Sequence, residues 1–300
     1  MKVLVVGATG MLGSLVCRGL VEEGIQVRTL VRPSSDAVKV GALRALGAET
    51  VKGDLKERAS LDAACANVDA AISTANSVIS RQAGDSIETV DERGQLSLVE
   101  AATKAGVKRF VYVSVSPGRL PLDIPFLRAK RSVEERLRRG PMEYVIVQPG
   151  AFMEIWLSPM MGFNHVNATA TVFGSGENPV SYISIADVAR FIVTAVDGTS
   201  ATNRAILLGG PRSLSPNEIV RIFERETGKR FEVQYVPEEA LRAQFESAAD
   251  PLQKSFAGLS LVQAAGDPIE MTATLQEFPM RMTSVEEYVK RAVTASDQSD

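Results

Sequence analysis

A glycine-rich turn near the start of the chain constrains the fold more than any other feature. Gly7-Ala8-Thr9-Gly10-Met11-Leu12-Gly13 follows the apolar run Lys2–Val6 and opens a helical pattern over Met11–Glu23. Between a strand and a helix, such glycines permit a tight turn, a close approach of the backbone to a pyrophosphate, and close packing of helix on strand. The N–H groups at the helix start also attract phosphate. We therefore expect a bound dinucleotide, held by the following residues of the turn: Gly7, Thr9, Gly10, Met11, Leu12 and Gly13. The alternative is a turn that needs glycine and holds no ligand.

Apolar runs alternate with helical patterns through the first half of the chain, which is typical of βαβ units. The expected strands are Lys2–Val6, Ile25–Val31, Glu49–Lys52, Ala70–Ser73, Arg109–Ser114 and Tyr144–Val147. The expected helices are Met11–Glu23, Asp36–Leu46, Ser60–Ala66, Ile87–Lys104 and Arg128–Arg138. Continuous apolar runs indicate strands buried on both faces. The pattern predicts an α/β fold of the Rossmann type, with a doubly wound parallel sheet.

The pattern becomes less regular after Pro149-Gly150. We expect a dinucleotide-binding domain over residues 1–150 and a smaller, mixed substrate-binding region over 151–300, interleaved with the first domain. Two segments in the second half have a hydroxyl residue followed three positions later by an acid, Ser184 to Asp187 and Ser215 to Glu218. This spacing is typical of helix starts.

The end of the second expected strand distinguishes the two dinucleotides. An acidic residue there binds the ribose 2′-OH of NAD, whereas an arginine accommodates the 2′-phosphate of NADP. The strand ends in Leu30-Val31-Arg32-Pro33-Ser34-Ser35, with no acid in this position. Arg32 therefore predicts NADP(H) over NAD(H), unless Arg32 is only a solvated charge at a strand end.

Composition excludes several other classes. The 300 residues carry a net charge of −3, which gives no basic face for DNA or RNA. Two cysteines, Cys17 and Cys65, and one histidine, His165, predict neither a disulfide framework nor a metal site. No apolar run reaches the roughly 18 residues of a membrane span. We expect a cytoplasmic protein that does not bind a membrane. The sequence leaves open whether the protein forms a homodimer.

Several motifs together resemble the NmrA-like group of atypical short-chain dehydrogenase/reductases, which includes isoflavone-reductase-like enzymes and NADPH-dependent quinone reductases. The matching pieces span about the first two thirds of the chain: Gly7–Gly13, Leu30–Arg32, Gly53–Leu55, Gly106–Ser114, Gln148–Glu154 and Ile183–Ala189. By this resemblance Asp54 and Leu55 line the adenine pocket. It also implies that the cofactor contacts Ser73, Thr74, Ala75 and Asn76, and Pro149 and Phe152. For Asp54 and Asn76 an ordinary strand-end turn is the alternative.

The same resemblance places the chemistry at Lys130. In the wider superfamily, a Tyr-x-x-x-Lys pair on one helix face transfers the proton, and the lysine holds the nicotinamide ribose. This chain has Phe126 in the tyrosine position. Isoflavone-reductase-like enzymes, which this chain resembles, show a similar departure and depend on the lysine. By this resemblance Lys130 donates a proton if burial lowers its pKa. The alternative is a solvated helix face on which Lys130 pairs with Glu134.

Ser114 and Ser116 fall on one side at the end of the fifth expected strand, where the superfamily keeps a hydroxyl that orients the substrate. Both are turn residues in the alternative. An apolar stretch with Phe152, Trp156 and Phe163 suits an aromatic or quinone-like substrate, or else forms core. His165 could supply a proton nearby.

The resulting expectation is an NADP(H)-dependent reductase that transfers hydride to a small aromatic, quinone or enone substrate. The rival is a dinucleotide-binding redox sensor of the NmrA type, which acts through partner proteins without turnover. A scaffold without any cofactor conflicts with the intact glycine loop.

Overall fold

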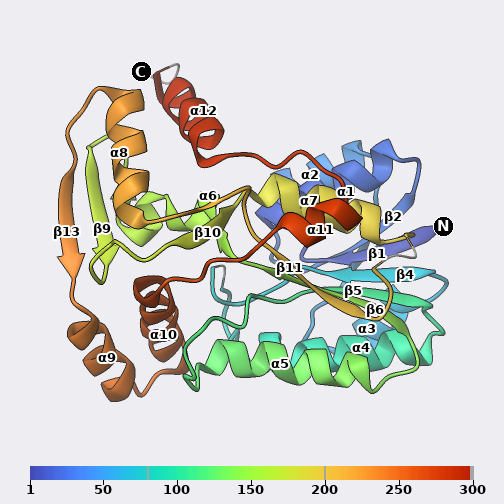
Figure 1. Ribbon diagram of the computed structural model, residues 1–300. Helices are drawn as coiled ribbons and strands as arrows, with labels where there is room; N and C mark the ends of the chain where they lie inside the picture. The colour runs from blue at the N-terminus through green and yellow to red at the C-terminus, as the bar shows by residue number, and fades with distance from the viewer. Residues whose placement is uncertain (80, 199–200, 298–300) are drawn as a thin grey trace. The chain divides into compact units, whose positions relative to one another are not determined.

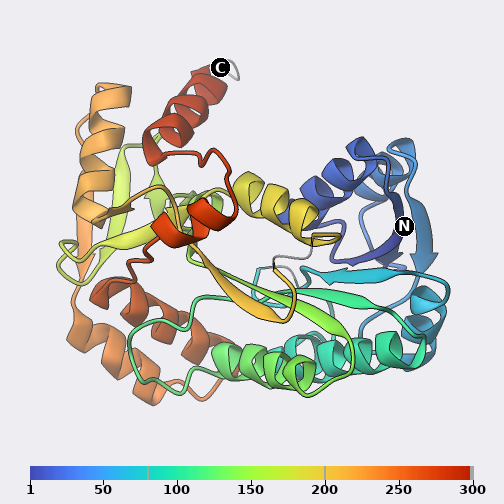
Figure 2. The ribbon, with the colours of Figure 1, turned by 45° about the vertical axis from the view of Figure 1, so that its right-hand side comes forward.

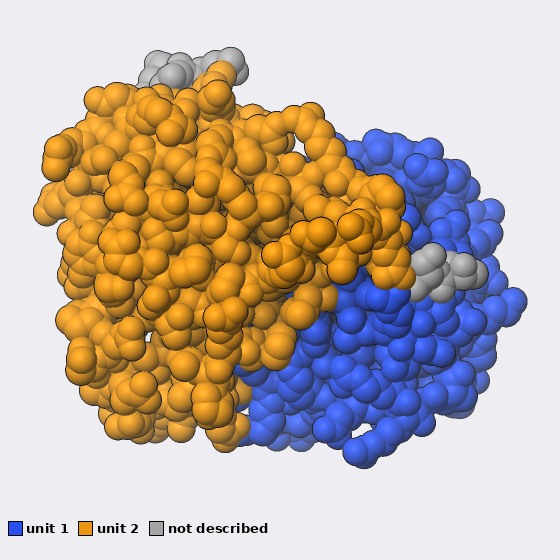
Figure 3. Space-filling view, viewed as in Figure 1, with its two compact units in different colours: residues 1–115, 125–148, 188–206 blue, residues 116–124, 149–187, 207–300 orange. Residues whose placement is uncertain are grey.

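The computed structural model describes residues 1–79, 81–198 and 201–297 (Figure 1). The chain forms two compact units, coloured separately in Figure 3. Unit 1 contains residues 1–115, 125–148 and 188–206, and unit 2 contains residues 116–124, 149–187 and 207–300. Each unit is therefore assembled from separate stretches of sequence.

A seven-stranded sheet forms the centre of unit 1, in the order β11-β6-β5-β4-β1-β2-β3. Its strands are β1 (Lys2–Val6), β2 (Gln26–Val31), β3 (Glu49–Lys52), β4 (Ala70–Ser73), β5 (Arg109–Val113), β6 (Glu143–Pro149) and β11 (Arg204–Leu208). Strands β1 to β6 pair in parallel throughout. The chain proceeds outward from β1 in one direction through β2 and β3, and from β4 in the other. The expected doubly wound α/β fold is confirmed, and its strand order reverses between β1 and β4, where such sheets bind ligands.

Helices cover both faces of this sheet (Figures 1 and 2). One face carries α1 (Met11–Glu22), α2 (Ala37–Ala45) and the unit 1 part of α7 (Ile185–Ala195). The other carries α3 (Arg58–Cys65), α4 (Gln95–Lys104) and α5 (Pro125–Arg138). A buried cluster joins the sheet to this second face, with Leu4, Leu98 and Phe110 fully inaccessible. The apolar runs of the sequence are thus buried on both sides, as parallel strands require.

The helix expected over Ile87–Lys104 consists of two parts. A π-helix, η1 (Ile87–Gly94), precedes α4. Ser86 begins η1 with a capping box, in which Ser86 Oγ accepts from the Thr89 N–H and Thr89 Oγ1 accepts from the Ser86 N–H. The face that η1 buries includes Asp91 beside apolar residues.

Two small three-stranded sheets and most of the remaining helices form unit 2, with orders β12-β10-β7 and β13-β9-β8. The strands are β7 (Ala151–Phe152), β8 (Phe163–Asn164), β9 (Thr169–Phe173), β10 (Val180–Ile183), β12 (Ser213–Leu214) and β13 (Glu232–Val236). The helices are α6 (Met153–Trp156), η2 (Pro159–Met161), α8 (Pro216–Thr227), α9 (Glu238–Ser247), α10 (Pro251–Ala265), α11 (Thr272–Glu277) and α12 (Val285–Asp297). Ser215 and Glu218 make the expected capping box at α8. At α7, the Asp187 carboxylate accepts from the Thr283 N–H at 2.7 Å and from Thr283 Oγ1 at 3.0 Å.

Candidate functional site

The glycine turn lies at the carboxyl end of β1, where the strand order reverses. Gly7 has φ +89°, in the left-handed region that favours glycine, and the Gly10 N–H donates to the Gly7 carbonyl at 2.9 Å. Gly10 is the N-cap of α1, and no side chain caps the helix start. The N–H groups of the first turn of α1 are therefore left to water or to a ligand.

The three glycines of the turn differ in what surrounds them. A Cβ on Gly13 would lie 2.2 Å from the Gly7 oxygen, and one on Gly7 would lie 2.6 Å from Thr74 Oγ1. On Gly10 the nearest atom would be the Gly7 oxygen at 3.2 Å. Gly7 and Gly13 are thus required by the packing of the turn itself. Apart from this tight contact, no described atom lies within 4 Å of the Gly10 Cβ position, which suits the close approach of a pyrophosphate.

The carboxyl end of β4 lies beside the same turn. Thr74 Oγ1 donates to the Val6 and Gly7 carbonyls at 3.2 and 3.4 Å, so Thr74 and Ala75 adjoin Gly7 as expected of neighbouring strands. The Ser73 hydroxyl is buried and donates to Gln95 Oε1 at 2.8 Å, which directs it into the protein. Asn76 accepts from the Val78 and Ile79 N–H groups in a local turn. Of these four residues, Thr74 and Ala75 are closest to the glycine turn.

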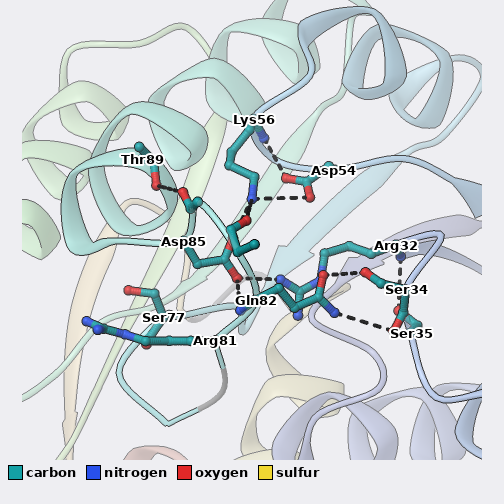
Figure 4. A network of polar contacts seen from close by, with 12 residues as sticks. Arg32, Ser34, Ser35, Asp54, Lys56, Ser77, Arg81, Gln82, Asp85 and Thr89 are labelled. Carbon is teal, nitrogen blue, oxygen red and sulfur yellow. Dashed lines mark hydrogen bonds and ion pairs between the residues drawn. The ribbon is translucent and has the colours of Figure 1, made fainter.

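Arg32 lies in a polar cluster at the ends of β2 and β3 (Figure 4). Its guanidinium donates to Asp85 Oδ2 at 2.6 Å, and Lys56 Nζ donates to the other oxygen of Asp85 at 2.5 Å. Asp54 accepts from the Lys56 N–H and lies 3.7 Å from Lys56 Nζ. Leu55 belongs to the core of unit 1. Arg32 is thus ion-paired rather than a free strand-end charge.

Lys130 is buried in unit 1, with only 3% of its surface exposed. Its Nζ donates to the Val113 carbonyl at 3.2 Å and lies over the rings of Tyr112 and Phe126, at 4.9 and 5.2 Å from their centroids. Burial lowers the pKa of Lys130, while the charge of Asp91 opposes that shift. A solvated helix face is therefore excluded for Lys130.

Glu134 has other partners than Lys130. Its buried carboxylate accepts from Ser114 Oγ at 2.6 Å and from Gln148 Nε2 at 2.9 Å, and it pairs with Arg131 and Arg138. The Ser114 hydroxyl, expected to orient a substrate, is thus engaged with Glu134 and Arg131.

Ser116, Pro149 and Phe152 lie in unit 2. The Ser116 N–H donates to the Pro149 carbonyl at 2.9 Å, and Ser116 Oγ accepts from the Gly118 N–H at 3.3 Å. Phe152 is half-buried at the end of β7. These contacts show a local turn at Ser116.

The aromatic stretch expected to contact substrate divides between core and surface. Met153 and Phe163 are core residues, and the Phe163 ring lies 4.6 Å from that of Phe223. Trp156 lines a small cavity of about 30 Å³ within unit 2, together with Phe173 and Tyr182. This volume is well below the roughly 150 Å³ of a cavity that admits benzene. The cavity therefore does not hold an aromatic substrate as it stands.

Asp91 was not anticipated from the sequence. It is fully buried, and it accepts from Ser77 Oγ at 2.5 Å and from the Ser77 N–H at 3.1 Å. Desolvation raises the pKa of Asp91, and the charge of Lys130 opposes this shift. The signal was present in the spacing, because Asp91 lies four residues after Ile87 and four before Gln95, on the buried side of the helix.

Tyr112 does not replace the phenol that is missing at Phe126. Its hydroxyl is buried, has no hydrogen-bond partner among the described residues, and has a pKa raised well above its ordinary value by desolvation.

No helix in the described part of the chain is long and apolar enough to cross a membrane.

Relatives with known names match over most of the chain. The Photosystem II assembly factor Ycf39 of Synechocystis sp. is 32% identical over 249 residues, covering 81% of this chain and 72% of that protein. The NAD(P)H azoreductase of Xenophilus azovorans is 32% identical over 265 residues, covering 85% and 86%. Among solved structures, the Citrobacter sp. triphenylmethane reductase complexed with NADP(H) superposes with a TM-score of 0.78 at 21% identity, covering 97% of this chain and 99% of that one.

The NmrA-like family matches residues 1–289, nearly the whole chain, in agreement with the motifs at Gly7–Gly13 and in the strands that follow. The chain therefore belongs to the NmrA-like family.

Proposed function

We propose that this protein is an NADP(H)-dependent reductase that transfers hydride to a small aromatic, quinone, enone or azo substrate. The observation that carries the proposal is the turn Gly7–Gly13 at the point where the sheet order reverses, with its uncapped helix start. The residues fit a dinucleotide, because a Cβ on Gly10 would meet the Gly7 oxygen at 3.2 Å and no other described atom within 4 Å, while Gly7 and Gly13 close the turn. NADP(H) rather than NAD(H) is supported by Arg32 at the end of β2, and by the relatives that bind NADP(H).

When bound, the nicotinamide supplies the hydride, and the protein supplies position and protons. The N–H groups at the start of α1 would bind the pyrophosphate, and Thr74, which directly follows β4, donates to the Gly7 carbonyl at 3.4 Å. Arg32 binds the 2′-phosphate. These groups require no change in protonation, so they position the ring without taking part in the chemical step.

Lys130 donates the proton that must follow the hydride to a carbonyl, quinone or azo acceptor. Burial lowers the pKa of Lys130, and the charge of Asp91 opposes this shift, so the ammonium gives up a proton more readily than that of an exposed lysine. Phe126 packs against Lys130 in place of a phenol. An acceptor that takes hydride readily needs no second acid, which fits quinones and azo dyes better than simple ketones.

The likeness to a Photosystem II assembly factor favours a second candidate. In that reading the same dinucleotide site controls binding to a protein partner, and no substrate is turned over. The two readings share the cofactor and differ in whether bound NADPH is ever consumed.

The deciding experiment measures NADPH oxidation by the purified protein with a panel of quinones, enones, aldehydes, azo dyes and triphenylmethane dyes, with NADH run alongside. We expect turnover with at least one class, faster with NADPH. Tight binding of NADP(H) without oxidation by any member would favour the partner-binding reading.

Arg32→Gln tests the choice of cofactor. We expect the affinity for NADP⁺ to fall about 10-fold, because one charge-assisted contact to the 2′-phosphate is lost, while NAD⁺ affinity changes little. Arg44→Gln, which removes an exposed charge at the end of α2, is the matched control. Titration calorimetry with both dinucleotides measures the effect, and equal losses for the two would contradict the assignment.

A further inference from the structure

The cations that end β2 and β3 already hold an anion of the protein itself. Arg32 and Lys56 both donate to the carboxylate of Asp85, whose side chain is only 1% exposed, and the Gln82 N–H donates a third hydrogen bond at 2.9 Å. Burial by itself would raise the pKa of Asp85, but the bonds from Lys56, Gln82 and Arg32 outweigh it and lower that pKa. Asp85 is therefore a charged carboxylate at neutral pH, facing the predicted 2′-phosphate site.

The segment that carries Asp85 is fixed at several points. The Ser34 hydroxyl hydrogen-bonds Gln82 Oε1, Lys56 Nζ reaches the Ala83 carbonyl at 3.5 Å, and Thr89 Oγ1 donates to the Gly84 carbonyl at 2.9 Å (Figure 4). These contacts join residues 82–85 to the end of β2, to the residues after β3 and to the start of η1. Asp85 is thus held against Arg32 by its own segment, and not by the ion pair alone.

The charges of the four residues that ion pairs join here cancel. Arg32 and Lys56 contribute two positive charges, and Asp54 and Asp85 contribute two negative ones. A 2′-phosphate brings a charge of about −1.5 to −2. The phosphate would meet four residues whose charges cancel and an arginine that is already paired with Asp85. The Asp85 carboxylate would also repel the phosphate. NAD(H), which has a hydroxyl at this position, meets neither the competition nor the repulsion.

We infer that Asp85 is a specificity-determining residue that competes with the cofactor 2′-phosphate for Arg32 and so limits the preference for NADP(H) over NAD(H). The inference rests on the proposed function, because it requires that a dinucleotide binds in the glycine turn and that Arg32 meets the 2′-phosphate of NADP(H). Binding of NADP(H) exchanges the Arg32–Asp85 ion pair for an Arg32–phosphate pair. The free energy needed to break the Arg32–Asp85 pair therefore reduces the net free energy of binding that the Arg32–phosphate pair contributes.

Asp85→Asn tests this inference by calorimetric titration with NADP⁺, NAD⁺, 2′,5′-ADP and 5′-AMP. We expect the variant to bind NADP⁺ and 2′,5′-ADP about 10-fold more tightly, because the cluster becomes positive, while NAD⁺ and 5′-AMP change less than about 3-fold. Glu88→Gln removes the same charge three residues away, from an exposed pair with Arg93, and should leave all four affinities unchanged. In an Arg32→Gln background, Asp85→Asn should give no more than about a 3-fold gain, since the competition for Arg32 is gone.

Weaker or unchanged binding of 2′,5′-ADP to a folded Asp85→Asn variant would overturn the inference, as would an equal gain for both dinucleotides. Gln82→Ala keeps all charges and removes the side-chain bond to Ser34. If Asp85→Asn does not fold, Gln82→Ala should raise NADP⁺ affinity about 3-fold by loosening the segment, and no gain there counts against the inference. If the wild-type protein binds neither dinucleotide, the proposed function is overturned as well. If both dinucleotides bind and Asp85→Asn leaves the ratio of NADP⁺ to NAD⁺ affinity unchanged, only the role of Asp85 is overturned.

Discussion

Replacing Gly13 by alanine is expected to destabilise the protein by about 3 kcal/mol and to abolish dinucleotide binding. The added Cβ would lie 2.2 Å from the Gly7 oxygen, 2.7 Å from the Gly7 carbonyl carbon and 2.9 Å from Ala8 Cα. All three are backbone atoms of the turn, so no side chain can rotate away to relieve the overlap. The helix must move off the strand, which displaces the N–H groups that we propose bind the pyrophosphate.

Gly41→Ala is the matched control for this prediction. Gly41 lies within α2, and a Cβ there would meet nothing within 4 Å. Alanine should therefore stabilise the helix by up to about 1 kcal/mol and leave binding unchanged. Denaturant unfolding and NADP⁺ titration of both variants provide the comparison. A Gly13→Ala protein that binds NADP⁺ as the wild type does would show that the turn does not hold the cofactor.

Lys130→Met is expected to lower kcat about 100-fold with the best substrate of the panel, because the proton donor is lost. The methionine fills a similar volume, and it removes a buried charge that burial already disfavours. The structure should therefore survive the change. Because only the ammonium form donates a proton, wild-type kcat should fall as the pH rises through the lowered pKa of Lys130, and this decline should be absent in the variant.

The control for Lys130 is Lys104→Met, which removes a lysine that is 72% exposed on α4. It should leave kcat and its pH profile unchanged. Stopped-flow measurement of NADPH oxidation across pH, at saturating cofactor, separates the two variants. Full turnover by Lys130→Met would remove Lys130 from the mechanism, whichever substrate is found.

Much of the first unit could be predicted because parallel strands bury both faces. The strands Lys2–Val6, Glu49–Lys52 and Ala70–Ser73 have the expected bounds. The π-helix Ile87–Gly94 was not predicted, since its apolar spacing resembles that of an α-helix over a single turn or two. The fifth helix begins at Pro125 rather than Arg128, because Phe126 and Leu127 pack inward before the charged stretch starts.

The geometry of the turn was predictable where local backbone chemistry determines it, as at Gly7 and Gly13. It was not predictable where the partner is distant in sequence. Arg32 and its counter-ion Asp85 lie 53 residues apart, so no local pattern connects them. Lys130 lies in a stretch of charged residues that is typical of a solvent-exposed helix face. Only the fold shows that Arg131 and Arg138 form ion pairs with Glu134, while the Lys130 side chain is buried.

Isotope transfer tests the central claim most directly. The protein is incubated with the best acceptor and with NADPH carrying deuterium on one or the other face of the nicotinamide ring, and the reduced product is analysed by mass spectrometry and NMR. A reductase of this design should deliver deuterium to the product from one face only, since a cofactor held by the glycine turn and Arg32 would bind in a single orientation. NADPH that binds tightly but yields no deuterated product with any acceptor of the panel would contradict a role in hydride transfer.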